Sequence, residues 1–198
     1  MISNGKFYES QFEEATIELL REAHWQYAFG DDIHRKYTDP LIEEDLRNFL
    51  AVQYKDKNLT TSEMDSIVAN LRNTGGQNDY YALRNTFLLY RDGYDFAYSD
   101  GRSNPFRLEY IDFEHPDHNI FRCVNQFVME QGRENRRPDI LLFINGIPVC
   151  IIELKNPTKQ NATIHDAHTQ ICTRYMRDIP ALLKYCALAV ISDGAKNA

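Results

Sequence analysis

The sequence has no run of 18 apolar residues and no charged-then-apolar segment at its N-terminus. A membrane-spanning helix needs about 20 mainly apolar residues and secretion needs a signal segment, so we expect a cytoplasmic protein that makes no use of a membrane. Basic residues are also in the minority, with 22 Lys and Arg against 29 Asp and Glu and a formal net charge of −7. Affinity for duplex DNA comes mainly from neutralised phosphates, so this charge argues against tight DNA binding by the chain alone.

Three motif types that would indicate a particular chemistry or architecture are also absent: CxxC pairs, a phosphate-binding loop and internal repeats. None of the four cysteines forms a CxxC pair, and three lie in apolar segments, which predicts reduced, buried thiols. No GxxxxGK[ST] motif occurs, so we do not expect ATP to bind this segment. There is no internal repeat or low-complexity tract, and 198 residues with 43% hydrophobic content suit a single domain spanning residues 1–198.

The most informative feature that is present is a pair of charged motifs at the two ends of an apolar stretch. Arg137-Pro138-Asp139 is followed, fourteen residues after Asp139, by Glu153-Leu154-Lys155, and the stretch between is apolar apart from Asn145. Mg²⁺ takes oxygen ligands, commonly one or two carboxylates with water and substrate phosphate. We therefore predict that Asp139, Glu153 and the Leu154 carbonyl hold Mg²⁺. Lys155 shares the face of Glu153 and could orient water and offset phosphorane charge.

The register of the two predicted strands decides whether the acids can meet. Asn145-Gly146 is a strong hairpin signal. A two-residue turn would pair Ile144 with Ile147 and place Asp139 and Glu153 on opposite faces of the sheet. A three-residue loop would instead bring Asp139 opposite Glu153. We predict this longer loop, or a β-bulge that restores the same parity.

The alternative is that the motif is accidental, because acid-x-lysine patterns arise by chance and a strand ending in Glu-x-Lys is commonly just a solvated strand end. The sequence that follows favours a site. Residues 163–177 have helical periodicity, with Gln170 off the apolar stripe, and residues 184–191 read as another buried strand. Two strands, a helix and a strand predict an α/β core.

Several motifs together resemble one known family. They are Val124-Asn125-Gln126-Phe127, Arg137-Pro138-Asp139, Phe143-Ile144-Asn145-Gly146-Ile147-Pro148, Ile152-Glu153-Leu154-Lys155-Asn156-Pro157, Asp178-Ile179-Pro180 and Ile191-Ser192-Asp193-Gly194. This set resembles the N-terminal nuclease region of the R (restriction/motor) subunit of type I restriction–modification enzymes, within the PD-(D/E)xK nuclease superfamily. The resemblance covers most of the chain and is close from about Leu108 onward.

The resemblance implies a PD-(D/E)xK (restriction endonuclease-like) α/β core, with a mixed central sheet flanked by helices and a helical N-terminal half. It makes Asp139 and Glu153 metal ligands and Lys155 the catalytic lysine. The family's opening helix carries an acidic residue to the active site, for which Glu9 is our choice and Glu13 the alternative. A glutamine and a tyrosine usually lie four residues apart on the later helix. Here Gln170 and Tyr175 are five apart.

That spacing separates the two residues in a straight α-helix, where each residue turns by about 100°. We therefore keep Gln170 as a site residue and assign Tyr175 to the core, because it falls on the apolar stripe. The family's other parts imply double-stranded DNA, modification (methyltransferase) and specificity subunits, and an ATP-driven motor as partners outside this segment. The end at Ala198, soon after a predicted strand, suggests a cut through a longer protein.

The first 105 residues are predicted to be mainly helical, with the catalytic α/β core in residues 106–198. Helices are expected from Tyr8 to His24, from Asp39-Pro40, after a Thr60–Glu63 capping box, and from Tyr80 to Tyr90. A loop is expected from Gly93 to Pro105. Strands are expected over residues 107–113 and 120–129.

The basic cluster of Arg133, Arg136 and Arg137 precedes the first acid. Phosphate positioning and an ordinary solvated loop are both open interpretations of it. Two HxxH pairs, His115/His118 and His165/His168, give a rival chemistry, because four imidazoles can form a zinc site. Chance spacing with surface or structural histidines is the plainer reading.

Two other functions compete with a DNA endonuclease. The same fold can serve as a non-catalytic module that docks the other subunits, with its acids as relics. A repair or recombination nuclease would share the site and differ in the attached domains.

Overall fold

A five-stranded mixed sheet lies at the centre of the chain, with strand order β1-β4-β7-β8-β9 in the computed structural model, which describes residues 9–155 and 164–193. The middle strands β4, β7 and β8 are antiparallel to one another, while β1 and β9 run parallel to their neighbours. The sheet strands are β1 (Gln26–Phe29), β4 (Phe121–Asn125), β7 (Ile140–Ile144), β8 (Ile147–Leu154) and β9 (Leu188–Ser192). The mixed α/β class predicted from the sequence is confirmed.

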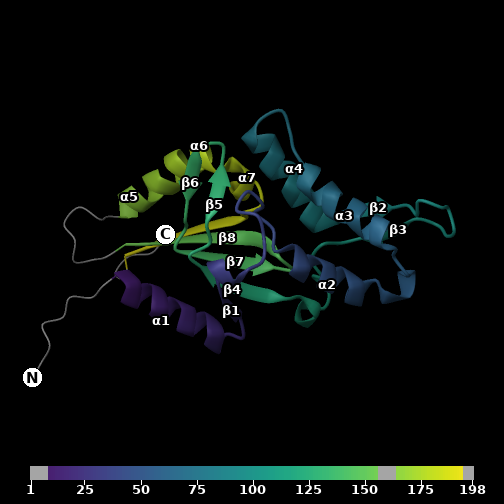
Figure 1. Cartoon of the computed structure of the whole chain (residues 1–198), viewed down its shortest axis with the longest axis horizontal. Helices are drawn as coiled ribbons and strands as arrows, with labels where there is room; N and C mark the ends of the chain where they lie inside the picture. Colours follow the sequence, from purple (N-terminus) through teal and green to yellow (C-terminus); the bar gives the residue numbers. More distant parts are fainter. Residues whose placement is uncertain (1–8, 156–163, 194–198) are drawn as a thin grey trace, which may run out of the picture.

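Helices cover both faces of this sheet (Figure 1). On one face lies α1 (Glu9–Glu22), whose Ile17 packs with Ile140, Ile152 and Leu154. On the other lies a broken helix made of α5 (Ile164–Thr169), the π-helix η4 (Gln170–Tyr175), α6 (Met176–Asp178) and α7 (Pro180–Leu183). Alternate residues of β7 and β8 therefore enter two separate cores, as the pleat of a strand requires.

A second group of helices packs against the end of the sheet where the β7–β8 turn lies. It consists of α2 (Glu43–Gln53), α3 (Thr61–Asn73) and α4 (Asp79–Asp92), with the small sheet β2 (Tyr94–Phe96) and β3 (Phe106–Leu108). The predicted capping box is present, because the Thr60 hydroxyl accepts from the Glu63 N–H and the Glu63 carboxylate accepts from the Thr60 N–H. No helix in the described part of the chain is both long and apolar enough to cross a bilayer.

Several predicted boundaries are wrong. β1 was not predicted from the sequence; it is an edge strand of four residues in which Tyr27 and Phe29 remain exposed, so the alternation that marks a strand is missing. α2 begins at Glu43, after Asp39-Pro40. β2 occupies part of the predicted 93–105 loop, and β9 begins only at Leu188, after the short helix α7 and the residues that follow it.

The turn between β7 and β8 differs from the prediction in length but not in consequence. Asn145 and Gly146 form a two-residue turn with φ of 51° and 74°, as a type I′ turn requires, so the three-residue loop is wrong. The pairing then shifts between Leu142 and Phe143. This bulge is the alternative that the sequence allowed, and it restores the parity of the strands beyond it.

Gly146 offers a test of how tightly this turn is held. A Cβ there would lie 2.1 Å from the Ile42 carbonyl oxygen at the start of α2, whereas at Gly101, which also has positive φ, nothing lies within 4 Å. We expect Gly146→Ala to lower the free energy of unfolding by about 3 kcal/mol or more, from left-handed strain plus a backbone clash. Gly101→Ala, which carries only the strain, should lower it by about 1 kcal/mol. Urea unfolding of both variants measures the difference, and equal losses would contradict the close approach.

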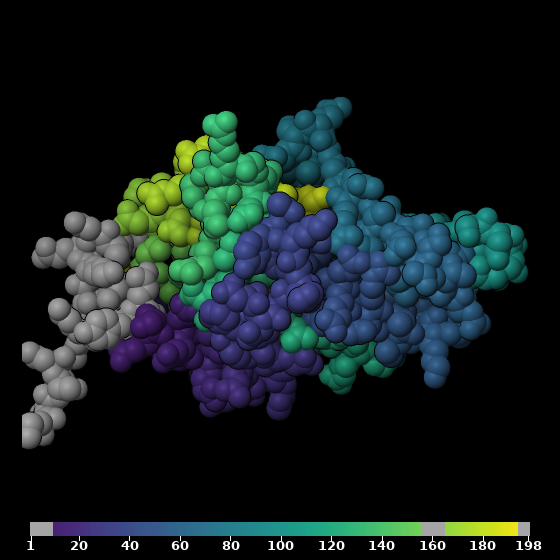
Figure 2. Space-filling model, viewed as in Figure 1, coloured from purple at the N-terminus to yellow at the C-terminus, as the bar shows by residue number. Residues whose placement is uncertain are grey.

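A β-hairpin stands out from the rest of the surface. It is formed by β5 (Met129–Gln131) and β6 (Glu134–Arg136), and its green atoms project at the top of the molecule in Figure 2. The hairpin comes directly before the Pro138-Asp139 segment in the chain, and Arg133 lies exposed at its turn. It therefore places a positive charge at the surface just ahead of Asp139.

Candidate active site

The β-bulge brings Asp139 opposite Glu153. Ile140 pairs with Ile152, so the next positions outward on the two strands are Asp139 and Glu153. Both then face away from α1, whose core contains Ile140 and Ile152. The Asp139 carboxylate accepts a hydrogen bond from the Leu154 N–H at 2.7 Å, which ties it to the end of β8.

Glu153 is the centre of a hydrogen-bond network although it is 0% exposed. Its Oε1 accepts from the Tyr175 hydroxyl at 2.6 Å, and its Oε2 accepts from Gln170 Nε2 at 2.8 Å. Lys155 Nζ lies 3.3 Å from the same Oε2 and donates to Gln170 Oε1 at 3.1 Å. Three of the residues predicted for the site, Glu153, Lys155 and Gln170, are thus in direct contact.

The electrostatics of Glu153 follow from this position. Burial and the nearby charge of Asp139 raise the pKa of Glu153 to about 7, although Tyr175 and Lys155 act in the opposite direction. Burial, with Glu153 alongside, also raises the pKa of Tyr175 above its ordinary value, so the phenol remains a donor. A buried carboxylate next to a second carboxylate is poorly compensated by one lysine, and a cation at this point would stabilise both acids.

Lys155 is positioned by the parallel pairing of β8 and β9. Its backbone N–H donates to the Ser192 carbonyl at 2.8 Å, which extends the ladder one residue beyond the end of β8. The side chain is 13% exposed, so its ammonium lies at the border between the buried Glu153 and the surface. A positive charge held there can meet an anion that approaches from solvent.

The assignment of Tyr175 to the core is confirmed, but the expectation that it cannot face the site together with Gln170 is wrong. The residue is 2% exposed and packs in the core, but its hydroxyl also accepts a hydrogen bond from Gln170 at 2.6 Å as it donates to Glu153. The prediction assumed a straight α-helix. In η4 the Met176 N–H reaches the Ile171 carbonyl five residues back, and this wider turn brings Gln170 and Tyr175 onto the same face.

Of the two candidates for the acidic site residue of α1, Glu9 and Glu13, only Glu13 has a described side chain. Glu9 opens α1, but its side chain lies outside the described residues. Glu13, the alternative, accepts hydrogen bonds from the side-chain amides of Asn125 at 2.7 Å and Gln126 at 3.2 Å. Because Asn125 pairs with Ile140, Glu13 lies at the end of the sheet that carries Asp139.

The basic cluster is divided by the fold. Arg136 forms ion pairs with Asp178 and Glu134, so its charge is used to fasten β6 to the broken helix. Arg133 and Arg137 are exposed. Only these two remain available for the phosphate positioning considered from the sequence.

Cysteines and histidines fit the sequence interpretation only partly. Cys123 and Cys150 are buried free thiols as predicted, whereas Cys172 is exposed and lies 3.5 Å from His168 Nε2. The two HxxH pairs do not combine into a four-histidine site. Among the described residues, His115 and His118 instead gather around Asp112.

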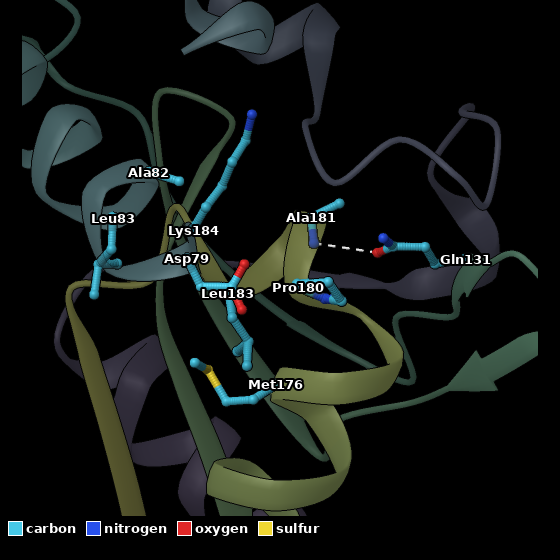
Figure 3. A pocket seen from close by; sticks show the side chains of 9 residues that line it. All are labelled: Asp79, Ala82, Leu83, Gln131, Met176, Pro180, Ala181, Leu183 and Lys184. Atoms are coloured by element: carbon cyan, nitrogen blue, oxygen red, sulfur yellow. Dashed lines mark hydrogen bonds between the residues drawn. The ribbon is translucent and has the colours of Figure 1, made fainter. Parts of the chain in front are cut away.

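A separate hollow lies between α4 and α7, away from the acids. It has a volume of about 200 Å³ and is lined mainly by apolar groups, including Leu83, Met176 and Pro180, with Lys184 at its side (Figure 3). Two of its lining residues are joined by a hydrogen bond of 3.1 Å from the Ala181 N–H to Gln131 Oε1. None of the predicted site residues lines it, so the hollow does not belong to the carboxylate cluster.

The fold and the cluster together define a mixed α/β protein with a buried acid–lysine–glutamine network at the end of its internal strand β8. The sequence profile of the family described as "Type I restriction enzyme R protein N terminus (HSDR_N)" matches residues 6–197. The chain belongs to this family.

Individual relatives support the same family membership. The chain is 32% identical over 197 residues to "Type I restriction enzyme HindI endonuclease subunit" of Haemophilus influenzae. The aligned region covers 94% of this chain and 18% of the relative. A relative from Methanocaldococcus jannaschii is 32% identical over 193 residues, covering 93% and 18%. "Type I restriction enzyme EcoprrI endonuclease subunit" of Escherichia coli is 33% identical over 105 residues, covering 51% and 31%. The chain thus spans about 18% of the length of the first two relatives.

Proposed function

We propose that this chain is a Mg²⁺-dependent PD-(D/E)xK endonuclease domain, which hydrolyses DNA phosphodiester bonds within a type I restriction enzyme. The observation that carries the proposal is Glu153, a fully buried carboxylate that faces Asp139 and contacts Lys155. A structural role alone does not account for two acids placed together beside a core, since their mutual repulsion and burial are both unfavourable. A bound cation and a phosphate substrate do account for them.

The donor set fits Mg²⁺. Asp139 and Glu153 offer carboxylate oxygens and the Leu154 carbonyl lies between Glu153 and Lys155, which matches the preference of this hard cation for oxygen ligands. The described residues of the network include no thiol or imidazole that would favour a softer metal. When bound, Mg²⁺ supplies Lewis-acid polarisation of the phosphodiester.

The chain's own residues then have separate tasks. Asp139 and Glu153 hold the cation, and the Leu154 N–H fixes the Asp139 carboxylate. Lys155 places a positive charge where negative charge grows on the phosphate oxygens and can hydrogen-bond the attacking water. Gln170 and Tyr175 position Glu153 and Lys155 through the contacts described above. The exposed Arg133 and Arg137 would contact phosphates of the DNA.

The relatives' printed names, which call them endonuclease subunits of type I restriction enzymes, support DNA as the substrate and other subunits as the partners. With a net charge of −7, this chain needs other parts to hold the DNA. We place these in the remainder of a longer polypeptide, with an ATP-driven motor, and in modification and specificity subunits.

Lys155→Ala in the intact enzyme tests the proposal. We expect DNA cleavage to fall roughly 10²- to 10³-fold, as when other preorganised charge-stabilising groups are removed, while ATP hydrolysis and subunit assembly stay at their original levels. Lys36→Ala, which removes an exposed lysine elsewhere, is the matched control and should leave cleavage unchanged. Undiminished cleavage combined with lost assembly would instead favour the docking module.

A further inference from the structure

Two histidine rings and one buried carboxylate form a compact cluster far from the nuclease site. It lies in the segment between β3 and β4, around the 3-10 turn Pro116–His118. The Nδ1 atoms of His118 and His115 lie 3.0 and 3.7 Å from the same Asp112 Oδ2. The rings are stacked, with centroids 4.9 Å apart and planes inclined by 17°. Asp112, His115 and His118 each offer one ligand atom, and these atoms all lie within 4.8 Å of one another.

The carboxylate is held in place from several sides. Asp112 is 4% exposed, and its Oδ1 accepts from the backbone N–H groups of Glu114 at 3.1 Å and His115 at 2.8 Å. Its Oδ2 accepts from Gln53 Nε2 of α2 at 3.0 Å. Orientation of a ligand by hydrogen bonds of this kind is typical of metal sites, where a second shell fixes the first.

We propose that Asp112, His115 and His118 form a zinc site with one position left open. Zinc binds histidine nitrogen and carboxylate oxygen at about 2.0–2.2 Å, so neighbouring ligands in a tetrahedron are about 3.3–3.5 Å apart. The distances of 3.0 and 3.7 Å from Oδ2 bracket this separation. Zinc takes the place of the proton between His118 Nδ1 and Oδ2, and that proton is released to solvent.

The site connects to the turn of the central hairpin. The side-chain oxygen Oδ1 of Asn119 accepts two hydrogen bonds, from the Asp112 N–H at 2.9 Å and from Asn145 Nδ2 at 2.8 Å. Asn145 is fully buried in the β7–β8 turn, at the opposite end of β8 from Glu153. Zinc here would fasten the 112–118 segment to α2 and to the hairpin turn, and it would do so separately from phosphodiester hydrolysis.

Equilibrium dialysis of the untagged chain against Zn²⁺, with metal content measured afterwards, tests the proposal. A Glu153→Gln background weakens binding at the nuclease site, so that the histidine cluster can be measured alone. We expect about one zinc per chain, and at least about 100-fold weaker binding in the His115→Ala/His118→Ala double variant, since even second-shell changes weaken metal binding 10- to 100-fold. Gln53→Ala should weaken it roughly tenfold. Both histidines are more than half exposed, so the double variant should fold.

The second HxxH pair is the matched control. His165→Ala/His168→Ala has the same spacing and should keep the full zinc content. Co²⁺ gives a second readout, because a four-coordinate site has more intense visible bands than a six-coordinate one, and these bands should disappear in the His115→Ala/His118→Ala variant. Absence of bound zinc, equal loss in both double variants, or zinc retained without His115 and His118 would each overturn the proposal.

Discussion

Replacing Glu153 with glutamine is expected to stabilise the metal-free chain at pH 8 while it abolishes cleavage by the intact enzyme. Because burial and Asp139 raise the pKa of Glu153 to about 7, ionising it in the folded state is unfavourable. The difference from an ordinary glutamate corresponds to about 3 kcal/mol at pH 8, and glutamine removes the charge while keeping the shape. Cleavage should fall by roughly 10³-fold or more, because the variant loses a proposed metal ligand.

The direction of the pH dependence is fixed by proton uptake. Between about pH 4.3, where a glutamate in the unfolded chain titrates, and about pH 7, the folded state holds a proton that the unfolded state has lost. The contribution of Glu153 to stability therefore falls as pH rises through this window and is constant above it. The stability gained by Glu153→Gln should be near zero at pH 4 and reach its full value by pH 8.

Urea unfolding in EDTA at several pH values measures this gain, and Glu130→Gln, at an exposed position of β5, is the control that should show none. Addition of Mg²⁺ reverses the ranking, since a ligand that binds only the folded state stabilises it in proportion to its affinity. The original chain should then be stabilised and the Glu153→Gln chain hardly at all. Equal stabilisation of both by Mg²⁺ would show that Glu153 is not a ligand.

The site could be predicted from sequence as far as the alternation of strand residues determines it. Asp139 and Glu153 had to share a face to act together, and that requirement predicted an irregularity in a hairpin whose Asn-Gly turn alone would have separated them. The structure has the two-residue turn that Asn145-Gly146 favours and corrects the parity with a bulge between Leu142 and Phe143. Asn145 and Gly146 thus form the turn that they favour, while the bulge places Asp139 and Glu153 on the same face.

Other features carry no such local signal. β1 is held by its pairing with β4, nearly one hundred residues later in the sequence, and its four residues show no alternation of buried and exposed positions. The expectation that Gln170 and Tyr175 face different sides failed because periodicity was counted at 3.6 residues per turn across a segment that is π-helical. The five-residue spacing of Gln170 and Tyr175 was itself the available clue, since only a wider turn lets both reach Glu153.

The π-helix predicts how the site should respond when a residue is removed or added between Gln170 and Tyr175. Deleting Cys172 leaves Gln170 and Tyr175 four residues apart, the spacing at which side chains meet on an α-helix. Cys172, Thr173 and Arg174 are all exposed between the buried Ile171 and Tyr175, so one of them can be removed without loss of core. We expect the shortened helix to become regular, to keep the contacts of Gln170 and Tyr175 with Glu153, and to retain cleavage in the intact enzyme within a few-fold of the original.

Inserting an alanine after Cys172 should have the opposite and much larger effect. Residues six apart differ by about 240° around an α-helix, so Gln170 and Tyr175 could no longer face Glu153 together. Either the phenol leaves the core, at a loss of about 3 kcal/mol or more, or Gln170 leaves the site. Circular dichroism, thermal unfolding and cleavage by the intact enzyme compare the two variants. If deletion and insertion proved equally damaging, the extra residue of the π-helix would be essential to the site, and the α-helical spacing could not replace it.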